Sequence, residues 1–482
     1  IKLHPDASFS RIFGILGIKD MESNTAKYKY RVVIQGSNVR DHSGEHVYFA
    51  DTSSAPTNMV AIRSVIAYGQ LSGGSCSQAD AQQAFIQPLL EEDVHMYIHV
   101  PPEMMSEEMR KQASKVQNPV FRLRRPLYGW SRSGNIWETH LADTLKEIKH
   151  GSDQWKPVEY WPQTFWKIGA KGKPIILTVY VDDFVLAGPG SEQEWPSIRK
   201  VIQTTEPTDV GRVLGVHHHF EKKGTVTKTE IEMVDYLKSS CELYNTYLRK
   251  TGAEKTWPLK PNVAYPWYEP TLDEINDLGF KDGVFGPHSA SLLMKALYCA
   301  RMARLDICYT INNLSRYVTK WTALQDKQLR HLYSYIAFSA EKKLHAQIDS
   351  KDLENVVLHA YPDADLAGAY DSSKATSGGF LEIAGNNSYF PLDWYSKRQS
   401  ATSHSTTEAE LVSASKMLRE SLVPIQHLWS IMLQRPMHAV IHEDNMSTIT
   451  VIESGYSPQL RHLAKHHRIS LGLVHELCKL PD

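Results

Sequence analysis

Cysteine is scarce in this sequence, and its few copies are widely spaced. The five cysteines stand at Cys76, Cys241, Cys299, Cys308 and Cys478, and no two form a C-x-x-C pair. A disulfide framework or a thiolate zinc site needs paired or regularly spaced cysteines, so neither is indicated. We therefore expect a reducing compartment.

Long apolar runs and an excess of charge of either sign are also missing. No segment offers the ~18 continuous apolar residues of a membrane span, and the first residues lack the basic-then-apolar order of a secretory signal. We therefore expect no membrane association. Lys and Arg number 53 and Asp and Glu 54, a formal net charge of −1, so the whole chain lacks the basic surface of an obvious nucleic-acid binder.

The chain does have enough apolar material for several cores. Hydrophobic residues make up 42% of its 482 residues and charged residues 22%, which is the composition of globular domains. Because single cores stop growing near about 250 residues, the length predicts roughly two to four domains. The sequence starts at Ile1 and not at Met, so we expect a piece of a longer protein.

One segment is strongly basic. Between residues 110 and 132 there are seven basic residues and no acidic one: Arg110, Lys111, Lys115, Arg122, Arg124, Arg125 and Arg132. A second basic stretch runs from Arg461 to Arg468. These stretches are the candidates for holding a polyanion backbone.

Periodicity predicts the elements that matter for function. Alternation and β-branching predict a strand over 28–34, and two apolar runs around Asp182-Asp183 predict a tight hairpin over 175–187. Apolar residues at helical spacing predict a helix over 62–71 and helices over 289–340, after an irregular connector over 250–290. From residue 351 onward the pattern predicts the order β-β-β-α-β-α.

Three carboxylates of the first half stand at predicted strand ends. Asp80 follows a short strand-like stretch, and Asp182 and Asp183 sit on the hairpin bend. Two or three such acids brought together bind a pair of Mg²⁺ ions about 3.5 to 4 Å apart, which is the chemistry of a polymerase. On its own, Asp-Asp at a bend is also ordinary turn chemistry.

The sequence around these acids favours the polymerase interpretation. Tyr-Val-Asp-Asp at 180–183, Gln-Ala-Asp-Ala-Gln-Gln-Ala-Phe-Ile at 78–86 and Leu-Tyr-Gly-Trp-Ser-Arg-Ser-Gly at 127–134 resemble the reverse transcriptase of copia-type LTR retrotransposons. Later landmarks follow in the family's order: Val-Leu-Gly-Val at 213–216, Leu-Tyr-Cys-Ala-Arg at 297–301, Ala-Arg-Leu-Asp-Ile at 303–307 and Leu-Ser-Arg-Tyr at 314–317. The resemblance covers the chain from about residue 25 to about residue 476.

The resemblance implies an α+β fold class. It predicts a right-hand polymerase with fingers and palm over 1–228, a thumb and connection over 229–350, and an RNase H-like α/β domain over 351–482 that is truncated at its C-terminal end. It also implies protease and integrase segments upstream, and a location in a cytoplasmic virus-like particle or in the nucleus. The oligomeric state stays open.

The resemblance also assigns roles to residues at matching positions. Asp80, Asp182 and Asp183 are expected to hold Mg²⁺, with Mn²⁺ as the other candidate metal. Further residues are expected to contact the dNTP, the RNA template and the DNA primer: Lys29 and Arg31 at the triphosphate, Phe85 as the steric gate against a 2′-hydroxyl, and Gly129 and Ser133 under the template and incoming base.

A second acidic set resembles the RNase H domain that follows reverse transcriptase in these elements. The matching text is Tyr-Pro-Asp-Ala-Asp-Leu-Ala-Gly at 361–368, Ser-Thr-Thr-Glu-Ala-Glu at 405–410 and His-Glu-Asp-Asn at 442–445. The resemblance makes Asp363, Glu410 and Asp444 metal ligands that activate water against the RNA strand of an RNA–DNA hybrid. We expect Glu408 to be solvated or a capping partner, Asp365 to be a surface acid, and Thr406 or Thr407 to cap the helix.

This second site departs from the family pattern. The family has Lys-His-Ile-Asp near the end, but here Lys-His-His-Arg at 465–468 puts Arg468 where that acid is expected. No residue can therefore be assigned as the fourth carboxylate.

Three consecutive histidines stand at His217, His218 and His219. No other His or Cys lies at the spacing from them that a metal site needs, so we do not expect them to bind a metal. We expect them at the edge of the palm.

The leading expectation is an RNA-directed DNA polymerase with an attached RNase H domain. The alternative is a catalytically inactive retrotransposon-derived fragment that acts as a nucleic-acid-binding or interaction module. An unrelated metal-dependent nuclease would fit the second acidic set but leave Tyr-Val-Asp-Asp unexplained.

Overall fold

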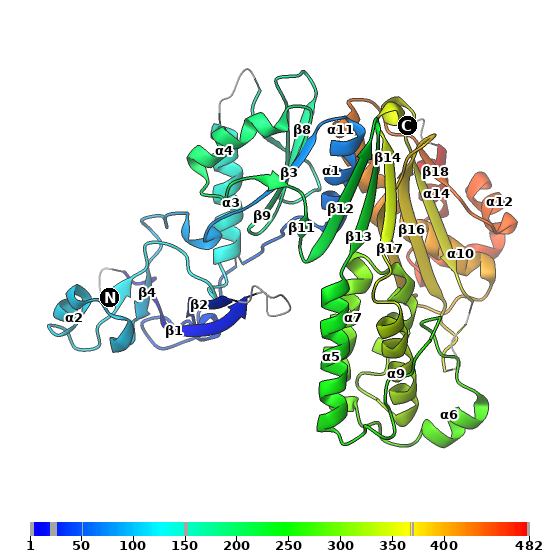
Figure 1. The fold of residues 1–482 in the computed structure, drawn as a ribbon, viewed down its shortest axis with the longest axis horizontal. Coiled ribbons are helices and arrows are strands. Elements are labelled where there is room, and N and C mark those ends of the chain that lie inside the picture. The colour runs from blue at the N-terminus through cyan, green and yellow to red at the C-terminus, as the bar shows by residue number, and fades with distance from the viewer. Residues whose placement is uncertain are drawn as a thin grey trace. The chain divides into compact units, whose positions relative to one another are not determined.

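The structure is a computed structural model that describes residues 4–19, 27–50, 52–148, 153–366, 368 and 371–479 (Figure 1). The chain forms two compact units. The first comprises Ile1–Asn58 and Ser75–Asp209, and the second comprises Met59–Gly74 and Val210–Asp482. The helix that starts at Met59 therefore belongs to the same unit as the C-terminal half. The three segments expected from the sequence are each continuous along the chain, and the boundaries of those segments remain predictions.

The first unit contains a four-stranded sheet in the order β2-β1-β4-β5. Its strands are β1 (Ser8–Lys19), β2 (Lys27–Ile34), β4 (Met96–His99) and β5 (Phe121–Arg122). β1 and β2 form an antiparallel ribbon, and its base packs on a core that includes Ile34, Met96 and Trp130. The strand expected over 28–34 is confirmed as β2. The short helix α2 (Glu107–Ala113) begins after Ser106, whose hydroxyl accepts the amide of Met109.

A six-stranded sheet in the order β10-β3-β9-β8-β7-β6 forms the rest of that unit. Its strands are β3 (Ser75–Asp80), β6 (Lys156–Pro157), β7 (Thr164–Ile168), β8 (Pro174–Tyr180), β9 (Asp183–Gly188) and β10 (Thr208–Asp209). β8 and β9 are apolar along nearly their whole length because both faces of the sheet are covered. The helices α3 (Ser133–Glu147) and α4 (Trp195–Val201) contribute Trp137, Leu141 and Ile198 to the same core. The predicted hairpin over 175–187 is confirmed.

The second unit is built on an eight-stranded sheet in the order β11-β12-β13-β14-β17-β16-β15-β18. Its strands are β11 (Arg212–Val213), β12 (Val216–Lys223), β13 (Val226–Glu232), β14 (Leu344–Asp349), β15 (Val357–Ala364), β16 (Thr376–Ala384), β17 (Tyr389–Arg398) and β18 (Ala439–Ile441). β15, β16 and β17 are antiparallel neighbours, and β18 runs parallel to β15. His217, His218 and His219 lie in β12, next to the edge strand β11 of this sheet, and their assignment to the edge of the palm remains a prediction.

Helices of the second unit follow the expected order. The helices predicted over 289–340 are confirmed as α7 (Gly286–Met302), α8 (Cys308–Ser315) and α9 (Ala323–Phe338), with α5 (Val234–Lys250) beside them (Figure 1). The expected irregular connector contains one helix, α6 (Leu272–Leu278), which the Thr271–Glu274 capping box begins. The later helices are α10 (Thr406–Met417), α11 (Val423–Leu433), α12 (Met446–Ser454), α13 (Leu463–His466) and α14 (Leu471–Lys479).

Helix α1 (Met59–Leu71) is held in the second unit by a buried arginine. Arg63 is 2% exposed, and its guanidinium donates to the carbonyl oxygens of Arg301 and Met302, the last two residues of α7. It also donates to Leu392 O at 2.9 Å and lies 3.8 Å from the ring centroid of Trp394, on β17. The charge thus sits at the negative end of a helix and on an aromatic face, which are favourable places for a buried cation.

Burial of His218 predicts an acid-sensitive second unit. The side chain is 4% exposed, neither ring nitrogen has a hydrogen-bond partner, and burial lowers the pKa of His218 to about 4. Because an unfolded histidine titrates near ~6.5, the unfolded chain takes up more protons as the pH falls from about 6.5 to about 4. The free energy of unfolding should fall by up to about 3 kcal/mol across that window.

Chemical denaturation followed by circular dichroism across this pH range would measure the effect. His218→Leu, which cannot be protonated, should remove that part of the pH dependence. An unchanged pH dependence in the variant would contradict the prediction.

Candidate functional site

The β8–β9 hairpin holds two of the predicted carboxylates beside the third. Asp182 lies in the bend, Asp183 begins β9, and Asp80 at the end of β3 is the register partner of Asp183. The side chains of Asp80 and Asp182 are exposed. The three acids therefore meet at one end of the six-stranded sheet, as their places at strand ends predicted.

The bend between these strands has an uncommon backbone conformation. Val181 has a φ of 57°, which is costly for a β-branched residue and persists only where surrounding contacts fix it. Two contacts do so: the indole N–H of Trp137 donates to Val181 O at 2.8 Å, and the amide of Ala81 donates to Asp182 O at 2.7 Å. Ala81, the residue after Asp80, thus holds the backbone of Asp182 directly.

Phe85 lies next to this acidic end of the sheet. It sits in the 3₁₀ turn Ala84–Ile86, which follows β3, and its ring centroid is 5.0 Å from that of Tyr128. The pKa of the Tyr128 hydroxyl is raised by burial and by the negative charge of Asp182, while the charge of Arg31 opposes the shift. Phe85, Arg31 and Asp182 therefore all lie around Tyr128.

Of the other residues predicted to contact the dNTP, template or primer, two are exposed and two are fixed by contacts within the protein. Lys29 and Arg31 are exposed and lie two residues apart on β2, so they share one face of the ribbon. Ser133 is 1% exposed and donates to Leu127 O at 2.7 Å. Gly129 has a φ of +86°, and a Cβ there would lie 2.4 Å from Ile34 O, so this position needs glycine. Ser133 and Gly129 shape the backbone at this site.

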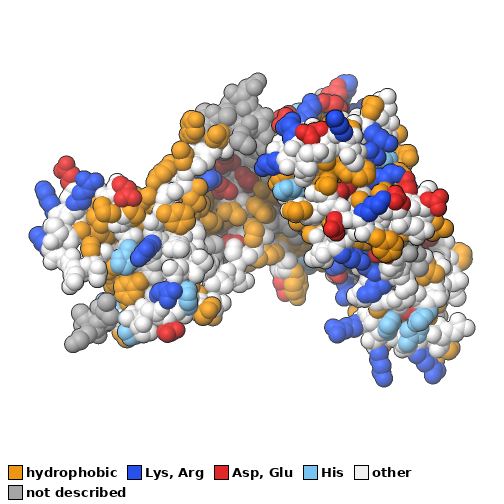
Figure 2. Space-filling model, turned by 90° about the horizontal axis from the view of Figure 1, so that it is seen from below, with side chains coloured by type: hydrophobic (Ala, Val, Ile, Leu, Met, Phe, Trp, Pro, Cys, Tyr) orange, Lys and Arg blue, Asp and Glu red, His pale blue; other side chains and the backbone are white. Residues whose placement is uncertain are grey.

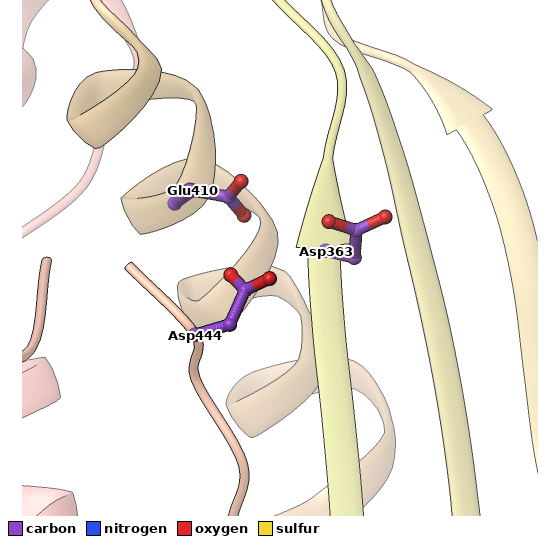
Figure 3. A group of neighbouring side chains, drawn as sticks. All are labelled: Asp363, Glu410 and Asp444. Carbon is purple, nitrogen blue, oxygen red and sulfur yellow. The ribbon is translucent and has the colours of Figure 1, made fainter. Parts of the chain in front are cut away.

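The second acidic set is drawn more tightly together. Asp363 on β15, Glu410 on α10 and Asp444 after β18 turn their carboxylates toward one another (Figure 3). Among the residues that the structure describes, they are the only group of three His, Cys, Asp or Glu side chains whose ligand atoms all lie within 4.8 Å. Asp80, Asp182 and Asp183 are not drawn together to that degree.

Electrostatic repulsion is strong in this second set. Glu410 is 4% exposed, and its Oε2 is buried without a hydrogen-bond partner. Burial, together with the negative charges of Glu443, Asp363 and Asp444, raises the pKa of Glu410 to about 7. A buried, unpartnered oxygen among like charges is a site that a cation would stabilise.

Glu443 is a fourth carboxylate near this group that the sequence interpretation missed. Burial and the charges of Asp444 and Asp363 raise its pKa to about 7, and its Oε2 is also buried without a partner. Its position directly before Asp444 was the available signal. Arg468, which stands where the family has an acid, is exposed and has a φ of 57°.

One expectation about the surroundings was wrong: the cap of α10 is Ser405, whose hydroxyl accepts the amide of Glu408, and not Thr406 or Thr407. Glu408 is a capping partner and is not solvated. It is fully buried, and its carboxylate accepts from the amide of His404 at 2.9 Å, His462 Nε2 at 3.0 Å and His467 Nε2 at 2.8 Å. Asp365 is half-buried, and its carboxylate accepts the amide of Thr376 at the start of β16.

Basic side chains are dispersed. Lys and Arg are spread among acidic residues over the face shown in Figure 2 and do not gather in one patch. Within the basic stretch, Arg122 donates to the carbonyls of Glu92 and Val94, and Arg125 to that of Ile86. These contacts fix the positions of the two guanidinium groups. In the described part of the chain, no helix is long and apolar enough to cross a membrane.

Both acidic sets suit a hard divalent cation. Their donors are carboxylate oxygens alone, the ligands that Mg²⁺ and Mn²⁺ prefer. In the second set, a positive charge would stabilise Glu410 Oε2, which is buried without a hydrogen-bond partner. The residues present therefore fit the metal that the sequence predicts.

Comparison with known protein families gives a match in the first half of the chain. Residues 15–239 match the family described as "Reverse transcriptase (RNA-dependent DNA polymerase)", and the three mixed sheets are consistent with such a domain. This family typically uses a divalent metal, and it implies a nucleic-acid template and primer. The match includes both carboxylate-bearing segments of the six-stranded sheet.

Whole-chain relatives are retrotransposon proteins. The chain is 25% identical over 443 residues, 91% of its length, to the "Retrovirus-related Pol polyprotein from transposon RE1" of Arabidopsis thaliana, and 22% identical over 463 residues, 94% of its length, to that from transposon TNT 1-94 of Nicotiana tabacum. It spans only 27% and 32% of those polyproteins. A putative transposon Ty5-1 protein of Saccharomyces cerevisiae is 24% identical over 71% of this chain and 99% of its own length. The resemblance to copia-type Pol polyproteins is thus confirmed as a distant homology over most of the chain.

The raised pKa values of Glu410 and Glu443 predict that metal binding depends on pH. In the folded protein both carboxyl groups have a pKa of about 7, whereas an unfolded glutamate titrates near pH 4.5. The folded protein therefore holds extra protons between about pH 4.5 and 7. Its free energy of unfolding falls as the pH rises through that window. Cation binding requires the charged forms. Mg²⁺ should therefore raise the unfolding temperature of the second unit more at about pH 8 than at about pH 5.5.

Differential scanning fluorimetry with and without Mg²⁺ would measure this difference. The double variant Asp363→Asn/Asp444→Asn should lose most of the Mg²⁺ effect at the higher pH. An equal effect in the parent chain at both pH values would contradict the prediction.

Proposed function

We propose that this chain is an RNA-directed DNA polymerase whose second unit carries a ribonuclease H site. The observation that carries the polymerase part is the placement of Asp80, Asp182 and Asp183 at one end of a sheet within the segment that matches the reverse transcriptase family. The nuclease part is supported by the Asp363, Glu410 and Asp444 group.

In the polymerase site, Asp80 and Asp182 would hold the divalent cations, with Asp183 beside them. Cations bound there would lower the pKa of the primer 3′-hydroxyl and neutralise charge on the departing pyrophosphate. The protein itself contributes positioning: the contacts of Trp137 and Ala81 fix the hairpin bend before substrate arrives. Lys29 and Arg31 would bind the triphosphate from the exposed face of β2.

Phe85 would select the sugar of the incoming nucleotide. Its ring packs beside Tyr128 and partly against the core of the first unit, so it cannot easily move aside. A rigid ring beside the sugar would exclude a 2′-hydroxyl by contact. Discrimination between dNTP and rNTP would therefore come from packing and not from hydrogen bonding.

In the second unit, Asp363, Glu410 and Asp444 would hold the metal for hydrolysis of the RNA strand in a hybrid. The register of β15 with β18 and the cap of α10 at Ser405 bring these three acids together from separate elements. The sheet order β17-β16-β15-β18, with β18 parallel to β15 and α10 against β15, supports an RNase H-like domain. Glu443 would add negative charge close to the metal.

Matched substitutions of equal size test the two sites on one chain. Asp182→Asn should reduce dNTP incorporation on a primed RNA template by about 100-fold or more, because a neutral amide holds the cation poorly. Asp363→Asn should leave incorporation intact and abolish cleavage of a labelled RNA–DNA hybrid. Both activities are measured with Mg²⁺ and with Mn²⁺.

Each result separates the alternatives. Incorporation by the parent chain no greater than by Asp182→Asn would exclude the polymerase and favour an inactive nucleic-acid-binding module. Hybrid cleavage unaffected by Asp363→Asn would exclude the assigned nuclease site.

A smaller residue at position 85 tests the sugar selection. Phe85→Val should raise the efficiency of rNTP incorporation relative to dNTP by about 10-fold to 100-fold, because the excluded volume is removed. Single-nucleotide extension with matched dCTP and CTP measures the ratio, and dCTP incorporation by the variant is its internal control. An unchanged ratio would show that another residue is the gate.

A further inference from the structure

Four histidines gather at the N-terminal end of α10, where no function has been assigned. His404 stands just before the helix, whereas His462, His466 and His467 come from the segment around α13, far later in the chain. The carboxylate of the buried Glu408 lies between these two segments and accepts hydrogen bonds from both of them.

Three of the rings form a nearly equilateral triangle, and we call them the histidine triad: His404, His462 and His466. The ring centroids of His404 and His462 are 5.8 Å apart, those of His404 and His466 are 6.2 Å apart, and those of His462 and His466 are 6.4 Å apart. His404 and His466 are exposed, and the side chain of His462 is 40% exposed. An ion in solution can therefore reach the triad.

In two of these rings one nitrogen already has a hydrogen-bond acceptor. His462 Nε2 lies 3.0 Å from Glu408 Oε1, and His466 Nε2 lies 3.1 Å from the carbonyl oxygen of Thr402. Because a carboxylate and a carbonyl oxygen accept hydrogen bonds, Nε2 carries the proton in both rings. The Nδ1 atom of each neutral ring then keeps its lone pair for another partner.

This arrangement is typical of histidines that bind a metal ion. A metal-binding imidazole almost always donates its other N–H group to a carboxylate or a backbone carbonyl, which fixes the tautomer and the orientation of the ring. Glu408 supplies the carboxylate to His462, and Thr402 supplies the carbonyl to His466. Glu408 also accepts from His467 Nε2 at 2.8 Å, so the carboxylate that orients the triad is itself held in place.

The spacing of the rings suits a small transition-metal ion. With a zinc–nitrogen distance of about 2.0 to 2.1 Å, the ring centres of two imidazole ligands lie about 5.5 Å apart. The centroid distances in the triad exceed this value by less than about 1 Å. The ring nitrogens do not all lie within 4.8 Å of one another, so metal binding requires small rotations of the exposed side chains of His404 and His466.

We propose that His404, His462 and His466 bind one Zn²⁺ ion, with His462 and His466 using Nδ1 and with water as the fourth ligand. Imidazole nitrogen suits Zn²⁺, whereas the carboxylate sets of this chain suit Mg²⁺ and Mn²⁺. The ion joins the segment around α13 to the start of α10, the helix that carries Glu410. The zinc site does not depend on the proposed polymerase and nuclease functions.

Calorimetric titration of the chelator-treated chain with ZnCl₂ tests the site, with millimolar Mg²⁺ present to occupy the acidic sets. The variants are His404→Ala and His466→Ala. His219→Ala is the matched control, because His219 is an exposed histidine whose ring is stacked 6.2 Å from that of His217. Asp363→Asn tests whether the ion is held by the second acidic set instead.

The parent chain, His219→Ala and Asp363→Asn should bind Zn²⁺ with the same dissociation constant. His404→Ala and His466→Ala should bind it about 10-fold to 100-fold more weakly, the size of effect expected when a metal site loses one of its histidines or their partners. Co²⁺ in place of Zn²⁺ should show the strong visible absorption of a four-coordinate ion in the parent chain and lose it in His404→Ala.

Three results would overturn the proposal: equal affinity in His404→Ala and the parent chain, an equal loss in His219→Ala, or loss of the ion in Asp363→Asn. Circular dichroism checks the fold of each variant. The two exposed histidines can be replaced without removing a buried side chain, and His404→Gln takes the place of His404→Ala if that variant fails to fold.

Discussion

Repulsion between carboxylates of like charge is the constraint on which both candidate sites depend. The first site gathers three acids at strand ends, and the second joins Asp363 and Asp444 with Glu410 of a helix. Nothing in the acids themselves favours that closeness. In the second unit the repulsion is visible in Glu410 and Glu443, whose raised pKa values mean that each holds its proton near neutral pH. The fold must supply the free energy that keeps such groups together until a cation offsets it.

The two units supply that free energy through different local structures. In the first, backbone contacts hold a valine at positive φ, and the indole of Trp137 and the amide of Ala81 fix the bend that carries Asp182. In the second, hydrogen bonds to a buried acid fix the helix that carries Glu410: Glu408 is held by two histidines that belong to the segment after α12. In both cases the acids are positioned by neighbouring residues that do not themselves belong to the acidic group.

Helix α1 shows how closely segments far apart in the sequence are combined. It leads directly into β3, which carries Asp80, yet its own side chains are buried in the second unit, where Arg63 binds the end of α7 and the face of Trp394. Because a buried guanidinium without its acceptors is strongly disfavoured, this helix is committed to that unit. A single cut of the chain after Asp209 would separate α1 from its partners in the second unit.

The sequence by itself determined the elements and most of the acids. Strong periodicity predicted β2, the β8–β9 hairpin and the helices α7 to α9. Motifs that resemble those of the family indicated the six carboxylates, although the sequence could not show where they lie in the fold. Local patterns of this kind survive because they reflect which face of each element is buried. The sequence failed where a residue's surroundings come from distant segments: the burial of Glu408 by His462 and His467, the nearness of Glu443 to Asp363, and the burial of His218. Only the tertiary structure decided those, because strand register and not sequence spacing determines which side chains meet.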